Sequence, residues 1–148
     1  SYPALIAMFQ AGPPALSPFA IPGVDEAANT VEYFVHHEDV RRATEGWTER
    51  PVDEGLAEAL WKRLKGARLF LRAAPTGVML ARNRADGHGP GGRPAADDLI
   101  VAKHALPSVT VTGSPAELTM WSMGRVSAAR VTLDGPDEAV EKLTAWRR

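Results

Sequence analysis

The spacing of the apolar residues changes at Pro75, and this change restricts the fold more than any other feature of the sequence. Before it, apolar residues recur every three or four positions, as on one face of a helix. These residues are Leu56, Leu60, Leu64, Ala67 and Leu71. After it, short β-branched runs bounded by glycine and proline are typical of strands. We therefore expect an α+β protein with a domain boundary near Pro75, which divides a helical region (1–74) from a small α+β domain (75–148).

The same patterns predict the individual elements. Capping residues, prolines and apolar spacing predict helices over residues 1–9, 24–43, 53–71, 115–123 and 136–146. Apolar and β-branched runs predict strands over residues 78–80, 99–101, 109–112 and 130–133. Four prolines make residues 12–23 a connector, and the glycine-rich residues 83–98 are expected to form a long hairpin loop.

Composition excludes several classes of protein. The 148 residues are 45% apolar, enough for a real core, but no apolar run is long enough to cross a membrane. The 17 basic and 18 acidic side chains show no basic excess, so we expect neither a nucleic-acid nor a membrane partner. Because cysteine is absent, any metal must be held by histidine and carboxylate side chains. The first residues lack a signal-peptide pattern, and we expect a cytoplasmic protein.

One helical segment carries polar residues that ordinary packing does not require. In the helix predicted over 24–43, Glu32 and His36 are four positions apart and Asp39 follows three later, so all three project from one face. A carboxylate and a neutral imidazole suit a divalent ion such as Zn²⁺, with Asp39 as a third ligand or a support. The alternative is a solvated helix face whose charges pair along the helix.

These residues belong to a longer run with a family resemblance. Residues 29–42 (Asn-Thr-Val-Glu-Tyr-Phe-Val-His-His-Glu-Asp-Val-Arg-Arg), residues 109–113 and Met123-Gly124-Arg125 resemble an actinobacterial branch of the mycothiol-dependent maleylpyruvate isomerase-like proteins, in the DinB-like superfamily. The similarity covers nearly the whole chain in order. It implies a DinB-like helical bundle that holds one divalent metal, followed by a small α/β domain of sterol-carrier-like topology. The resemblance places Glu32 and His36 at the last two ligand positions.

The chain departs from this family at its start. Family members have several tens of residues before the point that corresponds to Ser1, and these carry the first bundle helices and an upstream histidine ligand. Neither His88 nor His104 falls at that ligand position. A bundle normally has four helices, and a catalytic metal at least three protein ligands. We therefore expect a partial bundle with an incomplete metal site, in a fragment or in a chain that another chain completes.

Arg125 is the second candidate site residue. The resemblance implies that Gly124-Arg125 faces the metal cleft, where the guanidinium would bind a carboxylate of a substrate or of a thiol cofactor. Arg125 is thus the candidate catalytic and cofactor-binding residue. The alternative is a cation that interacts with the C-terminal end of the preceding helix. We expect Arg41 and Arg42 to be the solvated end of their own helix.

Two functions from different classes follow. The first is a metal-binding protein, with zinc as the expected metal and, if it is an enzyme, mycothiol-dependent isomerisation or thiol transfer on a small-molecule substrate. The second is a non-enzymatic α+β interaction module with a vestigial metal site. In that case two apolar stripes, one on residues 5–9 and one on residues 56–64, are exposed unless a homodimer partner or an N-terminal segment covers them. The surroundings of Glu32 and His36 distinguish these two functions.

Overall fold

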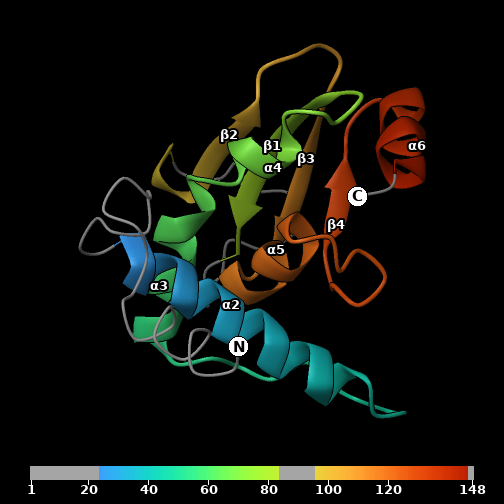
Figure 1. Cartoon of the computed structure of the whole chain (residues 1–148). Helices are drawn as coiled ribbons and strands as arrows, with labels where there is room; N and C mark the ends of the chain where they lie inside the picture. The colour runs from blue at the N-terminus through green and yellow to red at the C-terminus, as the bar shows by residue number, and fades with distance from the viewer. Residues whose placement is uncertain (1–23, 84–95, 147–148) are drawn as a thin grey trace, which may run out of the picture.

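The computed structural model describes residues 24–83 and 96–146 (Figure 1). It contains helices α2 (Val24–Arg42), α3 (Glu54–Leu64), α4 (Arg68–Leu71), α5 (Pro115–Ser122) and α6 (Asp137–Ala145), the 3-10 helix η2 (Ala96–Asp98), and strands β1 (Gly77–Arg82), β2 (Leu99–Lys103), β3 (Ser108–Gly113) and β4 (Thr132–Asp134). The expected α+β class is confirmed. The helix expected over 1–9, the connector over 12–23 and most of the loop over 83–98 lie outside the described residues.

The strands form one mixed sheet in the order β2-β1-β3-β4 (Figure 1). β1 pairs antiparallel with β2 and parallel with β3, while β4 pairs antiparallel with β3. Along β3, Val109 and Val111 are fully buried, and Thr110 and Thr112, which alternate with them, are only partly buried. Such alternation marks a sheet with one face packed against a core.

The helices α3 to α6 cover that packed face. Their side chains Leu64, Leu71, Leu118, Trp121 and Leu143 join the buried strand residues in one hydrophobic cluster. Since α3 and α4 precede Pro75 and the strands follow it, the core is continuous across the residue at which we place a domain boundary. A two-layer arrangement of this kind buries the apolar stripe of each helix against the sheet.

The helix expected over 53–71 is divided into two. α3 ends at Leu64 and α4 begins at Arg68, and between them Gly66 and Ala67 donate to the carbonyls of Arg63 and Leu64 in tighter, three-residue turns. Glycine has low helix propensity, which accounts for the break. The predicted apolar spacing nevertheless holds, because the residues on its inner side are buried.

The connection between β2 and β3 crosses the start of β1 at Gly77. A Cβ atom built on Gly77 would lie 2.1 Å from the carbonyl oxygen of Ala105, so no residue with a side chain fits this crossing. The Gly77 N–H donates to the carbonyl of Pro107 at 3.0 Å, which ties the connection to β1. Glycine is required here by the close approach of two backbones.

α2 packs at the end of the sheet layer, against α3 and α5 (Figure 1). Phe34 and Val35 of α2 contact Leu60, Ala116 and Met120 in a second hydrophobic cluster. The expectation of an exposed stripe on residues 56–64 is therefore wrong, because α2, α5 and the sheet cover it. In the described residues, no helix is both long and apolar enough to cross a membrane.

Candidate functional site

The two predicted metal ligands lie on the outer side of α2. Glu32 and His36 are one helical turn apart, and both side chains are exposed. They are not paired with each other, and neither side chain forms a hydrogen bond or ion pair with residues 29–83 or 96–146. Over the same residues, no three histidine, aspartate or glutamate side chains are grouped so that they could hold a metal ion.

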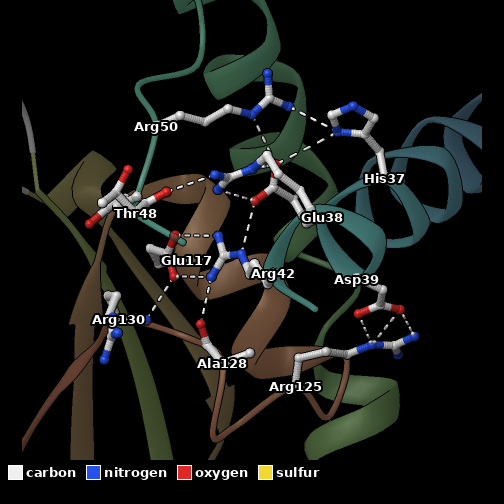
Figure 2. Close-up of polar contacts among 12 residues, drawn as sticks. His37, Glu38, Asp39, Arg42, Thr48, Arg50, Glu117, Arg125, Ala128 and Arg130 are labelled. Carbon is white, nitrogen blue, oxygen red and sulfur yellow. Dashed lines mark hydrogen bonds and ion pairs between the residues drawn. The ribbon is translucent and has the colours of Figure 1, made fainter. Parts of the chain in front are cut away.

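The structure brings the third predicted site residue, Arg125, to the same helix (Figure 2). Its Nε donates to the two carboxylate oxygens of Asp39 at 3.1 and 3.2 Å, and one terminal nitrogen donates to Asp39 Oδ2 at 2.7 Å. Asp39 follows His36 by three positions, about one helical turn. Residues far apart in the sequence thus meet beside the predicted metal ligands.

The end of α5 positions Arg125. Gly124 adopts φ +86°, a left-handed conformation that favours glycine, and its N–H donates to the carbonyl of Trp121. The N–H of Arg125 donates to the carbonyl of Met120. These two bonds form a Schellman motif, which turns the chain sharply at the helix end. The Gly124-Arg125 pair therefore has a structural reason to occur together at this junction.

The Asp39–Arg125 ion pair has three hydrogen-bond contacts but does not use the whole guanidinium. Hydrogen bonds from Arg125 hold the pKa of Asp39 below its usual value, and Asp39 in turn raises the pKa of Arg125. Arg125 also donates to the carbonyl of Met123 at 2.7 Å, in keeping with the alternative of a cation at a helix end. Three of the five guanidinium N–H groups are used in these contacts, and the side chain is one third exposed. Two N–H groups are therefore left for an anionic ligand.

A buried ion-pair cluster lies one turn further along α2, and sequence reasoning missed it (Figure 2). The Arg42 guanidinium donates to Glu117 at 2.5 and 2.8 Å, to Glu38 at 2.8 Å and to the carbonyl of Ala128 at 2.6 Å. The side chains of Arg42, Glu38 and Glu117 are only 3%, 1% and 1% exposed. The expectation that Arg42 is solvated is therefore wrong. The reason is that α5 brings Glu117 against this side of α2.

Glu38 is the centre of this cluster. It also accepts from Arg41 at 2.8 Å and from Arg50 at 2.9 Å. Burial by itself would raise the pKa of Glu38, but the hydrogen bonds from the three arginines outweigh it and lower the pKa to about 2. For Arg42, burial acts to lower the pKa, and the bonds to Glu117 and Glu38 raise it above its usual value. Both groups are thus charged over the whole physiological pH range.

The sequence places Glu117 in a helix-capping pattern, which does not predict its ion pair with Arg42. Ser114 caps α5 as its sequence predicts, because its hydroxyl accepts the N–H of Glu117 at 3.3 Å. The carboxylate of Glu117 does not return to the cap, as it would in a capping box. It accepts hydrogen bonds from the Arg42 guanidinium and from the backbone N–H of Arg130 instead.

Trp47 covers the outer side of this cluster. The guanidinium carbons of Arg42 and Arg130 lie 4.5 and 4.8 Å from the centre of its ring, which is the geometry of cation–π contacts. Trp47 thus packs on arginine side chains at the Arg42 end of the cluster.

A surface cavity of about 560 Å³ lies beside this cluster, because Arg50, which binds Glu38, also lines the cavity. Its lining comes from the loop over residues 49–52, the first turns of α3 and α5, and the end of β1. Arg82 in this lining is already paired with Glu58 and with Asp98. The cavity contains none of the predicted site residues Glu32, His36 and Arg125.

No family model matches this chain, and neither the curated proteins nor the solved structures include one that is significantly similar to it.

Proposed function

We propose that this chain is a divalent-metal-binding protein of the maleylpyruvate isomerase-like type, with Glu32 and His36 as two of the metal ligands. The observation that carries the proposal is the position of Arg125. A guanidinium from the end of α5 lies against Asp39, one turn from His36, and this is where a substrate-binding cation would be needed. Glu32 and His36 are exposed, and no hydrogen bond or ion pair among the described residues uses their side chains, so their lone pairs are available.

The chemistry of the donors fits part of a zinc site. A neutral imidazole nitrogen and a carboxylate oxygen are common zinc ligands, but a catalytic zinc has three protein ligands. Since the described residues contain no third ligand in reach, the proposal requires one from elsewhere in the chain or from a second copy of it. When bound, such a metal would lower the pKa of a water or thiol at its open position.

The chain's own residues would orient the reactants. Asp39 fixes the guanidinium of Arg125 through its Nε side, so the two remaining N–H groups are held in place to receive a carboxylate. A small substrate or a thiol cofactor such as mycothiol carries carboxylates suited to this contact. On this basis we propose metal- and thiol-dependent isomerisation or transfer as the activity.

Metal content tests the proposal directly. After dialysis against buffer with trace zinc, elemental analysis of the full chain is expected to find about one equivalent of zinc. Glu32→Ala and His36→Ala are each expected to weaken zinc binding about a hundredfold or more, because each removes a direct ligand from a site that has few. Isothermal titration in the presence of a competing chelator measures this change.

Matched controls come from exposed residues of the same types. Glu141→Ala on α6 and His104→Ala between β2 and β3 remove an exposed carboxylate and an exposed imidazole far along the chain, and zinc affinity should stay within about twofold of the parent. If all four variants bind zinc like the parent, Glu32 and His36 are not ligands. If the parent binds no zinc under any of these conditions, the metal-binding function fails.

The alternative function, a non-enzymatic interaction module, is supported by two other residues of α2. Tyr33 and Val40 are 76% and 77% exposed, and they lie two turns apart on the same side of the helix. An apolar pair on the outer side of a helix suits contact with another helix, as in a homodimer. On this alternative, Tyr33→Asp with Val40→Asp converts a dimer to a monomer in light scattering. A parent protein that is already a monomer contradicts the homodimer.

A further inference from the structure

The overall charge balance of the chain conceals a strongly basic region. No aspartate or glutamate occurs between Glu58 and Asp86, although this stretch includes all of α4 and most of α3. Five of its cations are exposed, namely Lys62, Arg63, Lys65, Arg68 and Arg72. None of the five forms an ion pair among the residues that the structure describes. A net charge of −1 for the chain therefore says little about this surface.

Two large apolar side chains protrude among these cations. Leu69 and Phe70 are 66% and 56% exposed, on the side of α4 opposite to the buried Ala67 and Leu71. Residues 62–72 therefore present Leu69 and Phe70 surrounded by positive charge, and we name them the basic apolar surface. Neither the cavity of about 560 Å³ nor a second one of about 330 Å³ between β1 and the β2–β3 connection includes any of these residues.

We propose that the basic apolar surface binds an anionic membrane surface. Charge complementarity selects an anionic partner, because none of the five cations is neutralised by an ion pair among the described residues. The protruding leucine and phenylalanine select a lipid interface, where apolar side chains enter the boundary between headgroups and acyl chains while lysine and arginine contact the headgroup phosphates. This is peripheral binding, and it involves no membrane-spanning segment.

The same observations favour a membrane over the other anionic macromolecules. A nucleic acid would contact the cations through its phosphates and stack a base on the ring of Phe70. The exposed side chain of Leu69 cannot stack on a base and would remain in water. An acidic protein partner is anchored by side chains that fill pockets, and neither cavity lies beside this surface. A surface that carries both positive charge and exposed apolar side chains matches the interface of an anionic bilayer.

Vesicle co-sedimentation tests the proposal with the full chain. Vesicles of phosphatidylcholine with roughly a third phosphatidylglycerol are expected to bind the protein at low ionic strength, and vesicles of phosphatidylcholine alone are not. Arg68→Gln with Arg72→Gln, and separately Leu69→Ser with Phe70→Ser, are each expected to reduce binding about tenfold. Val126→Ser, which removes an exposed apolar side chain from the loop after α5, should change binding less than twofold.

A fluorescent label gives a second readout that does not depend on variant stability. Because the chain has no cysteine, Phe70→Cys and Val126→Cys can each be labelled with a polarity-sensitive fluorophore. Anionic vesicles should shift the emission of the label at position 70 to the blue and leave that at position 126 unchanged. Absence of binding to anionic vesicles overturns the proposal. So does equal or tighter binding of a short DNA duplex or of polyglutamate, with no shift at position 70.

Discussion

Replacing Arg42 by alanine is expected to lower the free energy of unfolding by about 3–5 kcal/mol, the range seen when one partner of a buried ion pair is removed. The variant leaves the Glu117 carboxylate buried with only the backbone N–H of Arg130 as a donor. It also removes one of the three arginines that bind Glu38. Urea unfolding at neutral pH, followed by circular dichroism, measures the loss.

Arg41→Ala is the matched control, because Arg41 is the neighbouring arginine on α2 and contacts the same carboxylate of Glu38. Its side chain is 25% exposed, against 3% for Arg42, so solvent screens the pair and we expect a loss of about 1 kcal/mol or less. Equal losses for the two variants would show that Arg42 does not act as a buried charge.

A double variant separates the ion pair from the packing around it. Arg42→Met with Glu117→Leu removes both charges and keeps apolar volume. The free energy of unfolding that this double variant loses should be smaller, by about 1 kcal/mol or more, than the sum of the losses measured for Arg42→Met and Glu117→Leu separately. Additive losses would mean that the two side chains contribute independently, against the bidentate contact between them.

The elements of the fold were largely predictable because they depend on local sequence. Helix α2, the cap at Ser114 and the strand run over residues 109–112 follow from capping residues, glycines and apolar spacing within a few positions. The break at Gly66 was missed, since one glycine changes helix propensity by only about 1 kcal/mol and packing decides the outcome. Local signals therefore predict element types better than element boundaries.

The long-range contacts of α2 were not predictable in the same way. Glu38 and Arg42 have the spacing of an exposed intrahelical pair, and nothing in that spacing indicates that Glu117 lies opposite them. The same holds for the basic apolar surface, because counts of charged residues average over the chain. The stretch between Glu58 and Asp86, which has no acidic residue, was the available signal in the sequence. It indicates a basic surface only after the positions of α3 and α4 are known.

The candidate metal site shows which part of a site a sequence can predict. Helical spacing places Glu32, His36 and Asp39 along one side of α2, and this needs only the helix. The contact between Asp39 and Arg125 depends on how α5 packs, and only the resemblance to a family directed attention to Arg125. The position of a third ligand depends on the tertiary structure in the same way, so spacing within one helix does not supply it.

Lowering the pH is expected to destabilise the protein through Glu38. The pKa of this carboxyl is about 2 in the folded protein against an ordinary value of 4.5, so the folded state binds its proton more weakly than the unfolded state does. The stabilisation is therefore complete above about pH 5 and is lost as the pH falls to about 2. The fall in pKa corresponds to about 3 kcal/mol in the free energy of unfolding.

Comparison with Glu38→Gln isolates this contribution from that of the other carboxylates. Glutamine keeps the size of the side chain but does not titrate, so the stability difference between parent and variant should be about 3 kcal/mol at pH 7 and should shrink steadily below pH 5. Glu138→Gln, which removes an exposed carboxylate paired with Lys142, is expected to give a much smaller difference, because solvent screens that pair. Urea unfolding at several pH values provides the curves. Parallel curves for the parent and Glu38→Gln would mean that the three arginines do not hold Glu38 in its charged form, and the ion-pair cluster would lose its central residue.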